Sequence, residues 1–311
     1  PDLTIKPELL AVGTWIYTAT QKTYPSEDNM YDASGYFLED GTSFSAPLVA
    51  GAAAVLKAAR PGLSVQQYRS LLINTASTLQ LGIPASPAPV QRAGTGLLNL
   101  PAALESTATA FPTSLSFGVG GSTMDISRDV TISNIGPAWE NFSISVQPIG
   151  SGPMPFVSTN TVQLDPGKVL AVTLRFTNTG LEPGEYQGFV QVQGATAAIP
   201  IRIPYWYAVP SSVPRYLTVL YSEEQASVGQ YLRNGIVFRV TEASGIPLFD
   251  TNPTVTATSG GGFVNSVRLV DSEVPGAYTV NLTLGPRAGR NVFQIQAGNL
   301  TRDVTIQGAA P

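Results

Sequence analysis

The feature that most constrains this chain is a change in the periodicity of its apolar residues near Phe111. Beyond that point apolar and polar residues alternate, as in segments 144–146, 170–176 and 199–203. The turn sequences "NIGP", "DPGK" and "EPGE" separate such segments. Short alternating segments between turns are typical of half-buried strands. The larger, C-terminal part of the chain is therefore expected to form β-sandwiches.

The strand-rich part is predicted to divide at "PYWYAVPSSVP", Pro204–Pro214, which has the composition of a linker. We expect one all-β sandwich over residues 110–207 and a second over residues 208–311. The linker carries the aromatic run Tyr205 to Tyr207. Such a cluster could bind a glycan, but at a linker it is more often a domain interface.

The first part of the chain, residues 1–109, mixes strand-like and helical patterns. The segment "KPELLAVGTWIYTA" has the apolar and β-branched content of a strand. The run Ala46–Ala59 is apolar and rich in alanine, which predicts a buried helix. Pro61 and Gly62 then end it.

Two further helices are predicted from their start signals. Ser64 and Gln67 have the spacing of a capping box, opening an amphipathic helix that runs to about Ala76. In "GTGLLNLPAALE", Asn99 or Leu100 is expected to begin a last helix, followed by a proline in its first turn.

Composition excludes several classes of function. The net charge is −4 and only 12% of residues are charged, so no basic surface for nucleic acid is expected. The chain has no cysteine, and no carboxylates have calcium-loop spacing, so we expect no disulfide, metal or other cofactor. We also expect no membrane-spanning run.

One stretch carries chemistry: "DGTSFSAPLVAGAAAVL", which begins at Asp40. Gly41 permits a tight turn, and Ser43 would stand at the N-terminus of the helix that follows. Free backbone N–H groups at that position can stabilise a developing oxyanion. Pro47 falls in the first turn, where a missing N–H costs little. Alternatively, the serine merely caps the helix.

The full string resembles the serine motif of subtilisin-like proteases, G-T-S-x-x-x-P-x-V-A-G. Upstream, "IKPELLAVG" is similar to the K-P-D-[VIL]-x-A-P-G segment of that family, and Gly94–Glu105 resembles its closing G-x-G-x-[IVL]-[ND] helix. The resemblance covers about residues 2–106. It implies that residues 1–109 are the C-terminal portion of an α/β catalytic domain with a parallel sheet.

The resemblance also assigns roles to single residues. It makes Ser43 the nucleophile and its backbone N–H one oxyanion donor. Gly41, Thr42 and Pro47 support the turn, and Phe44 stands where the family usually has methionine. The polypeptide chain of a protein substrate is the expected partner.

No base for this serine is present, because the sequence contains no histidine. In subtilisin the triad follows the order Asp, His, Ser. We therefore expect this chain to be a truncated or processed product, lacking the N-terminal part of the catalytic domain and inactive alone. Glu39 and Asp40 are candidate acids or bases, but before a turn they are more often solvated or capping. The related sedolisins fit "GTSFSAP" too, yet they also need an upstream Glu and Asp.

The two predicted β-sandwiches, the β modules, lead to a second hypothesis about function. The first resembles fibronectin-III or immunoglobulin-like domains that follow the catalytic domain in large cell-envelope subtilases. The second resembles bacterial immunoglobulin-like repeats of the invasin kind. We expect a secreted or cell-surface protein, of bacterial source, whose modules serve as a spacer or docking surface. The alternative is a non-catalytic adhesion or scaffold protein that keeps a decayed subtilase remnant.

Overall fold

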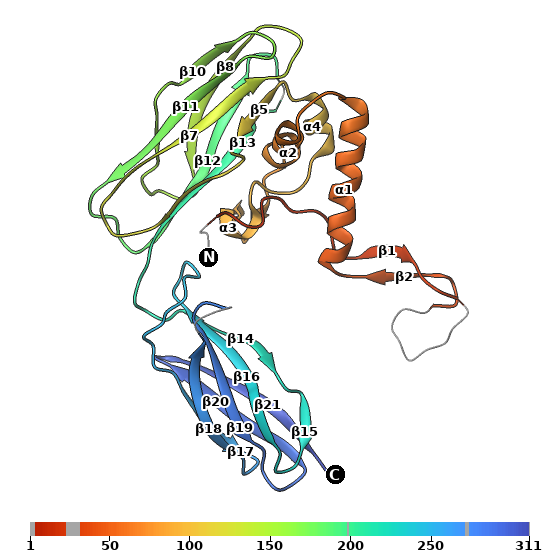
Figure 1. Cartoon of the computed structure of the whole chain (residues 1–311), viewed down its shortest axis with the longest axis vertical. Helices are drawn as coiled ribbons and strands as arrows, with labels where there is room; N and C mark the ends of the chain where they lie inside the picture. The colour runs from red at the N-terminus through yellow and green to blue at the C-terminus, as the bar shows by residue number, and fades with distance from the viewer. Residues whose placement is uncertain (1–3, 23–31, 198, 271–273, 311) are drawn as a thin grey trace. The chain divides into compact units, whose positions relative to one another are not determined.

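The computed structural model describes residues 4–22, 32–197, 199–270 and 274–310 (Figure 1). They form two compact units. The first holds the N-terminal helical region together with a β-sandwich, up to Leu181 and again over Glu185–Tyr207. The second holds another sandwich, from Ala208 onward, and the short segment Glu182–Gly184. The helical region is thus part of a larger unit and packs on the sandwich that follows it.

The N-terminal region contains four helices and two small antiparallel ribbons within its described residues. Its elements are β1 (Ile16–Ala19), β2 (Tyr36–Glu39), α1 (Thr42–Ala59), α2 (Val65–Asn74), β3 (Gln80–Leu81), β4 (Ser86–Pro87), α3 (Val90–Ala93) and α4 (Leu100–Glu105).

The start signals of α2 and α4 are confirmed. Ser64 Oγ accepts the Gln67 N–H at 3.2 Å, and Gln67 Oε1 accepts the Ser64 N–H at 2.8 Å, which completes the capping box. The helix ends at Asn74, two residues before the predicted end. Asn99 Oδ1 accepts the Ala102 N–H at 3.1 Å and so caps α4.

The expected parallel sheet is wrong for the described residues of this region. They contain one parallel bridge, between Leu10 and Leu97, and the pairs β1–β2 and β3–β4 are antiparallel. A parallel sheet needs strands joined by long crossovers, and no second crossover strand lies among these residues to extend the bridge.

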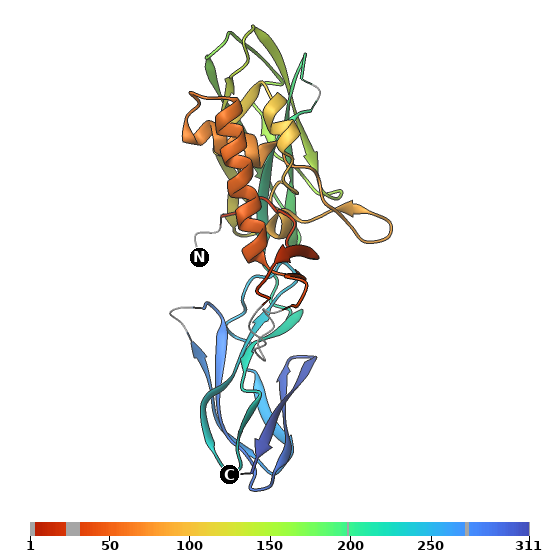
Figure 2. The same ribbon diagram turned by 90° about the vertical axis from the view of Figure 1, so that its right-hand side faces the viewer.

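Helix α1 begins at Thr42, earlier than the predicted Ala46, and it is not the buried helix that its composition suggested. Its buried residues are Ala52 and Leu56, which pack against α2 and α4. Leu48 and Val55 are 47% and 50% exposed. Figure 2, which views the molecule from the side of α1, shows no other element in front of it. Leu48 and Val55 are therefore on a side of the helix that the described residues leave open to solvent.

The same helix corrects another expectation. It is 18 residues long with a mean hydropathy of 1.3, so by length and composition it could cross a membrane. We expect no membrane-spanning run, whereas length and composition alone do not exclude one here. Core helices of globular domains meet the same two criteria.

The first sandwich consists of two sheets with strand orders β10-β8-β12-β13-β6 and β5-β7-β11-β9. Their strands are β5 (Ala108–Phe111), β6 (Leu115–Val119), β7 (Met124–Asn134), β8 (Glu140–Pro148), β9 (Phe156–Val157), β10 (Thr161–Leu164), β11 (Val169–Asn178), β12 (Gly184–Gly194) and β13 (Ile201–Val209). Phe176 lies in the core, and the rings of Phe117, Tyr205 and Tyr207 meet it edge-on with centroids 5.6, 6.3 and 6.1 Å away.

The predicted linker Pro204–Pro214 is wrong over its first half. Strand β13 continues to Val209, and every residue of the strand is buried. Tyr205 and Tyr207 point into the sandwich core, whereas Arg202, on the opposite face, bonds to the N-terminal region. A strand covered on both faces has a near-continuous apolar sequence, so the aromatic cluster is core and not an exposed glycan site.

Buried hydrogen bonds join the helical region to this sandwich. Arg202 is 7% exposed and donates to the carbonyl oxygens of Ala76 and Thr95, the latter at 2.9 Å. Asn74 Nδ2 donates to two carbonyls of the sandwich side, those of Thr113 and Arg202, both at 2.8 Å. Satisfied buried polar groups specify one arrangement of the two parts. The sandwich therefore acts as a docking surface for the helices.

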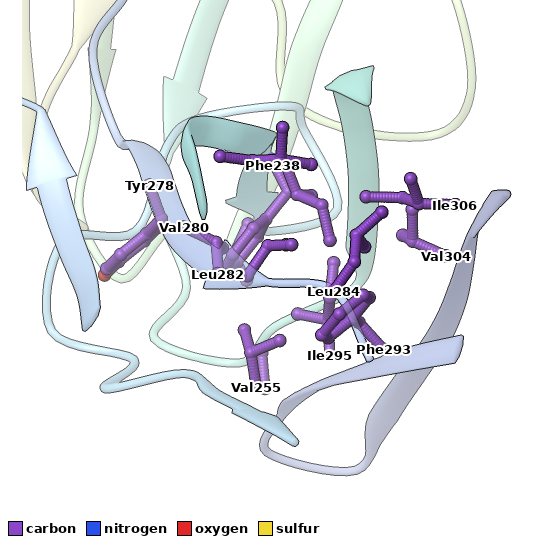
Figure 3. Close-up of a cluster of buried hydrophobic side chains, with 14 residues drawn as sticks. Phe238, Val255, Tyr278, Val280, Leu282, Leu284, Phe293, Ile295, Val304 and Ile306 are labelled. Carbon is purple, nitrogen blue, oxygen red and sulfur yellow. The ribbon is translucent and has the colours of Figure 1, made fainter. Parts of the chain in front are cut away.

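The second unit is a sandwich of sheets ordered β14-β16-β19-β18 and β15-β21-β20-β17. Its strands are β14 (Tyr216–Ser222), β15 (Gln225–Ser227), β16 (Tyr231–Thr241), β17 (Thr254–Ser259), β18 (Phe263–Val270), β19 (Ala277–Thr283), β20 (Gly289–Ala297) and β21 (Leu300–Ala309). Alternate residues of both sheets fill its core (Figure 3), among them Phe238, Leu282 and Phe293.

Candidate active site

The serine motif lies where a hairpin strand meets a long helix. Strand β2 ends at Glu39, Gly41 precedes the first turn, and Ser43 is the second residue of α1. The Ser43 side chain is exposed. The expected position of this serine, at the N-terminus of the helix, is thus observed. Figure 1 shows the β1–β2 ribbon at this end of α1.

The loop before the serine is anchored to the segment that the sequence placed upstream of it. The Gly41 N–H donates to Gly13 O at 2.7 Å, and Asp40 Oδ1 accepts the Trp15 N–H at 2.6 Å. Trp15 has a φ of 56°, an uncommon conformation for a residue with a side chain. A Cβ on Gly13 would lie 2.8 Å from Gly41 O, so a glycine is needed there.

The helix terminus supplies polar groups suited to an anion. The first N–H groups of a helix have no intrahelical acceptor, and the N-terminus carries partial positive charge. Phe44 N–H already donates to Gly41 O at 3.0 Å. The expectation that Pro47 falls in the first turn is wrong, because α1 begins at Thr42 and Pro47 lies inside the helix as its sixth residue. The N–H groups of Thr42 and Ser43 have no such partner within the helix. The first turn contains no acidic residue that would neutralise the dipole.

No imidazole can lie beside Ser43, because the chain has no histidine. The two neighbouring carboxylates are placed differently. Asp40 fixes the backbone of Trp15, and Glu39 sits on β2 opposite Ile16 in the hairpin register. Asp40 therefore has a structural partner, as expected for a residue before a turn.

The closing motif lies beside the upstream motif. Leu10 N–H donates to Gly96 O and Leu98 N–H donates to Leu10 O, both at 2.8 Å. A Cβ on Gly94 would meet the carbonyl oxygen of Glu8, so this glycine permits a close approach of two backbones. The three stretches that resembled the protease family are therefore brought together in one place.

An apolar hollow adjoins the motif on the exposed side of α1. It has a volume of about 430 Å³, and its walls come from α1, the upstream segment and the closing motif. The lining residues include Val12, Pro47, Leu48, Val55 and Leu97. This hollow, and the anchoring roles of Gly13, Trp15 and Asp40, were not predicted from the sequence. The segment "IKPELLAVG" included Gly13, and Asp40 was interpreted as a solvated or capping residue, but no sequence signal marked Trp15.

No metal site is found in the part of the chain that the structure describes, since no group of three or more Asp or Glu side chains gathers there.

Comparison with known proteins addresses the N-terminal region. A model of the subtilase family, Peptidase_S8, matches residues 1–109. Residues 1–109 are a subtilase-family region. Their relatives include the minor extracellular protease Vpr of Bacillus subtilis (strain 168), which is 34% identical over 114 residues, or 37% of this chain and 13% of that protein.

Plant subtilisin-like proteases are also similar to part of this chain. Subtilisin-like protease SBT3.12 of Arabidopsis thaliana is 39% identical over 72 residues, covering 23% of this chain and 9% of the relative. SBT3 of Solanum lycopersicum is 41% identical over 81 residues, covering 24% and 10%. The chain therefore spans only a small part of the length of these proteases.

The sandwiches have weaker likenesses among solved structures. A PapD-like domain of human CEP192 covers 34% of this chain and 86% of its own, at 13% identity and a TM-score of 0.30. Domains 4 and 5 of the S-layer protein SbsC cover 48% and 86%, at 19% identity and a TM-score of 0.28. Similarity of this extent assigns no family to the sandwiches.

Proposed function

We propose that residues 1–109 are the serine-bearing part of a subtilisin-like serine endopeptidase and that Ser43 is its nucleophile. The observation that carries the proposal is the placement of Ser43 at the N-terminus of α1, in a loop anchored by the Gly41–Gly13 hydrogen bond. The family match of the same residues supports it.

In the proposed reaction, Ser43 Oγ attacks the carbonyl carbon of a peptide bond while its proton passes to a histidine supplied from outside this chain. The tetrahedral oxyanion accepts a hydrogen bond from the Ser43 N–H and one from a second donor, also external. Collapse breaks the C–N bond, and the leaving amine takes the proton from the histidine. Water then hydrolyses the acyl ester and restores the serine.

The base must come from a further polypeptide segment, because this chain has no histidine. The apolar hollow on α1 supports this requirement. Leu48, Val55 and Val12 are about half exposed, and a helix of this apolarity is normally covered in a folded domain. We infer that the segment that brings the triad Asp and His also covers this surface. The isolated chain is accordingly inactive.

The remaining parts of the proposal concern context. The sandwiches are proposed to be fibronectin-III-like and immunoglobulin-like modules, the first of which supports the catalytic region through the Arg202 and Asn74 contacts. A secreted or cell-surface location, in a bacterium, is proposed from the absence of cysteine and from the extracellular relative Vpr.

The test is proteolysis of a casein or peptide substrate by this chain co-produced with the polypeptide encoded directly upstream. Activity should appear in the mixture, vanish with Ser43→Ala, and survive Ser45→Ala, a neighbouring serine in the same turn. Turnover that is unaffected by Ser43→Ala would overturn the assignment. An upstream frame that lacks Asp and His motifs would favour the alternative, a non-catalytic surface scaffold.

A further inference from the structure

At one end of the second sandwich, two arginines line a hollow whose other residues are mostly glycines. A hollow of about 520 Å³ opens there between the β17–β18 loop and the β19–β20 loop. Gly260 and Gly261 form one wall, and the segment from Pro286 to Arg290 forms the other. Arg287 and Arg290 are both exposed at this end.

The charge of this hollow is uncompensated. No Asp or Glu lines it, and neither guanidinium makes an ion pair with any described residue. The one side-chain bond found for either is a long contact, 3.4 Å, from Arg290 Nη2 to Thr305 Oγ1. Glu242 and Asp250 precede β17, whereas Gly260 follows it, so those acids lie at the opposite end of the sandwich. Glu223 and Glu224 precede β15, whose Gln225 pairs with Gln307, the β21 partner of Arg290, so these acids lie two strands away from Arg290 and do not line the hollow.

The two loops are held rigidly. Asn291 is fully buried, its Oδ1 accepts the Gly285 N–H at 2.8 Å, and its Nδ2 donates to Gly289 O at 3.3 Å. The loop backbones touch, since a Cβ on Gly260 would lie 2.6 Å from Arg290 O. Figure 3 shows Leu284 and Phe293, which flank the β19–β20 loop, within the core. The loop that carries both arginines is therefore anchored at each end.

We propose that this hollow is a binding site for an oxyanion group, a phosphate or carboxylate. Guanidinium groups present planar forks of donors that match such oxygens. Glycine walls let the ligand approach the backbone closely, and the preformed loops lower the ordering cost of binding. The site is independent of the subtilase region and of the proposed protease activity.

The test measures binding of the whole chain to short-chain polyphosphate and, separately, to polygalacturonate, with neutral dextran as the blank. The variant Arg287→Gln/Arg290→Gln should lose at least about tenfold in affinity, because each charge-assisted hydrogen bond contributes roughly that factor. The control Arg268→Gln/Arg302→Gln has the same net charge and alters arginines outside the hollow, so it should retain binding.

A second pair of variants keeps both arginines. Ala288 lies in the hollow between them. Ala288→Glu should abolish binding by placing a carboxylate there, while Ala288→Gln, of the same size, should keep most of it. Binding of one polymer only would identify the group and support the site. Binding of neither polymer above dextran, or equal losses in the Arg268/Arg302 control, would overturn the proposal.

Discussion

Replacing Arg202 by methionine tests whether the sandwich and the subtilase region form one cooperative unit. The guanidinium is buried at their junction, donates to the carbonyls of Ala76 and Thr95, and lies over the Phe189 ring at 4.9 Å from its centroid. Burial lowers the pKa of Arg202, but the group stays charged throughout the ordinary pH range. Methionine keeps the apolar stem and removes every donor.

The magnitude follows from the groups left behind. Ala76 and Thr95 are 2% and 1% exposed, so their carbonyls would lose a partner without gaining water. Each stranded buried acceptor costs about 1–3 kcal/mol, so the two together predict a fall of about 2–6 kcal/mol in the free energy of unfolding of the first unit. With a urea dependence of about 2 kcal/mol per molar, the midpoint should fall by roughly 2 M.

Tryptophan fluorescence during urea unfolding isolates this effect. All three tryptophans of the chain, Trp15, Trp139 and Trp206, lie in the first unit. The control is Arg175→Met, which breaks an exposed bidentate pair with Asp125 in the same sandwich and should leave the midpoint nearly unchanged. An Arg202→Met midpoint equal to that of the control would refute the claim that Arg202 joins the two parts.

Three further predictions follow from single contacts. Tyr205 OH is buried without a hydrogen-bond partner among the described residues, whereas Tyr207 OH donates to a carbonyl. In urea unfolding, Tyr205→Phe should therefore be neutral or stabilising, and Tyr207→Phe should lower the free energy of unfolding by about 1 kcal/mol. Equal losses in the two variants would contradict this. Gly13→Ala should disorder the serine loop by forcing its Cβ toward Gly41 O, seen as faster amide exchange at Gly41, and unchanged exchange would refute it. Burial tends to raise the pKa of Glu140, but hydrogen bonds from threonine side chains and backbone N–H groups outweigh it and hold this pKa below 4.5. The stability that this carboxylate provides should be full above pH 4.5 and lost as pH falls through the lower folded pKa. In Glu140→Gln, the free energy of unfolding, followed by fluorescence, should therefore depend less on pH in this acid range. An unchanged acid profile would contradict the assignment.

Local signals predicted local structure well. The capping box at Ser64 and the Asn99 cap each depend on residues three apart, so the sequence alone contains the whole interaction. The strand-rich texture after Phe111 likewise predicted two pairs of packed sheets. In these cases the physical cause lies within a few residues of the pattern.

The failures share a different cause. The second half of strand β13 was predicted to be a linker because of the prolines and aromatic residues of "PYWYAVPSSVP", yet the strand is buried on both faces by elements far away in the chain. The role of Arg202 at the junction was not predicted, because its acceptors, the carbonyls of Ala76 and Thr95, lie 126 and 107 residues away in the sequence. Helix α1 is expected to be buried because its composition suits a core, whereas among the described residues it buries only Ala52 and Leu56, which pack against α2 and α4.

The candidate site was partly predictable. The motif predicted Ser43 at the N-terminus of a helix, as observed. That the three stretches lie together, through contacts such as Leu10 N–H to Gly96 O, was not predicted. The anchors were missed because Asp40 acts on Trp15, 25 residues away, through a backbone N–H that no side-chain pattern records. The arginine hollow was missed for the same reason, since its two loops meet only in the folded sandwich.

The most direct test of the proposed protease role is labelling with a fluorophosphonate probe, followed by peptide mapping of the adduct. The chain alone should remain unlabelled, and a folded complex with the upstream polypeptide should carry the label on Ser43. The adduct should disappear in Ser43→Ala and persist in Ser45→Ala. A folded complex without label on Ser43, or with equal labelling of the Ser43→Ala variant, would contradict the assignment of this serine as the nucleophile.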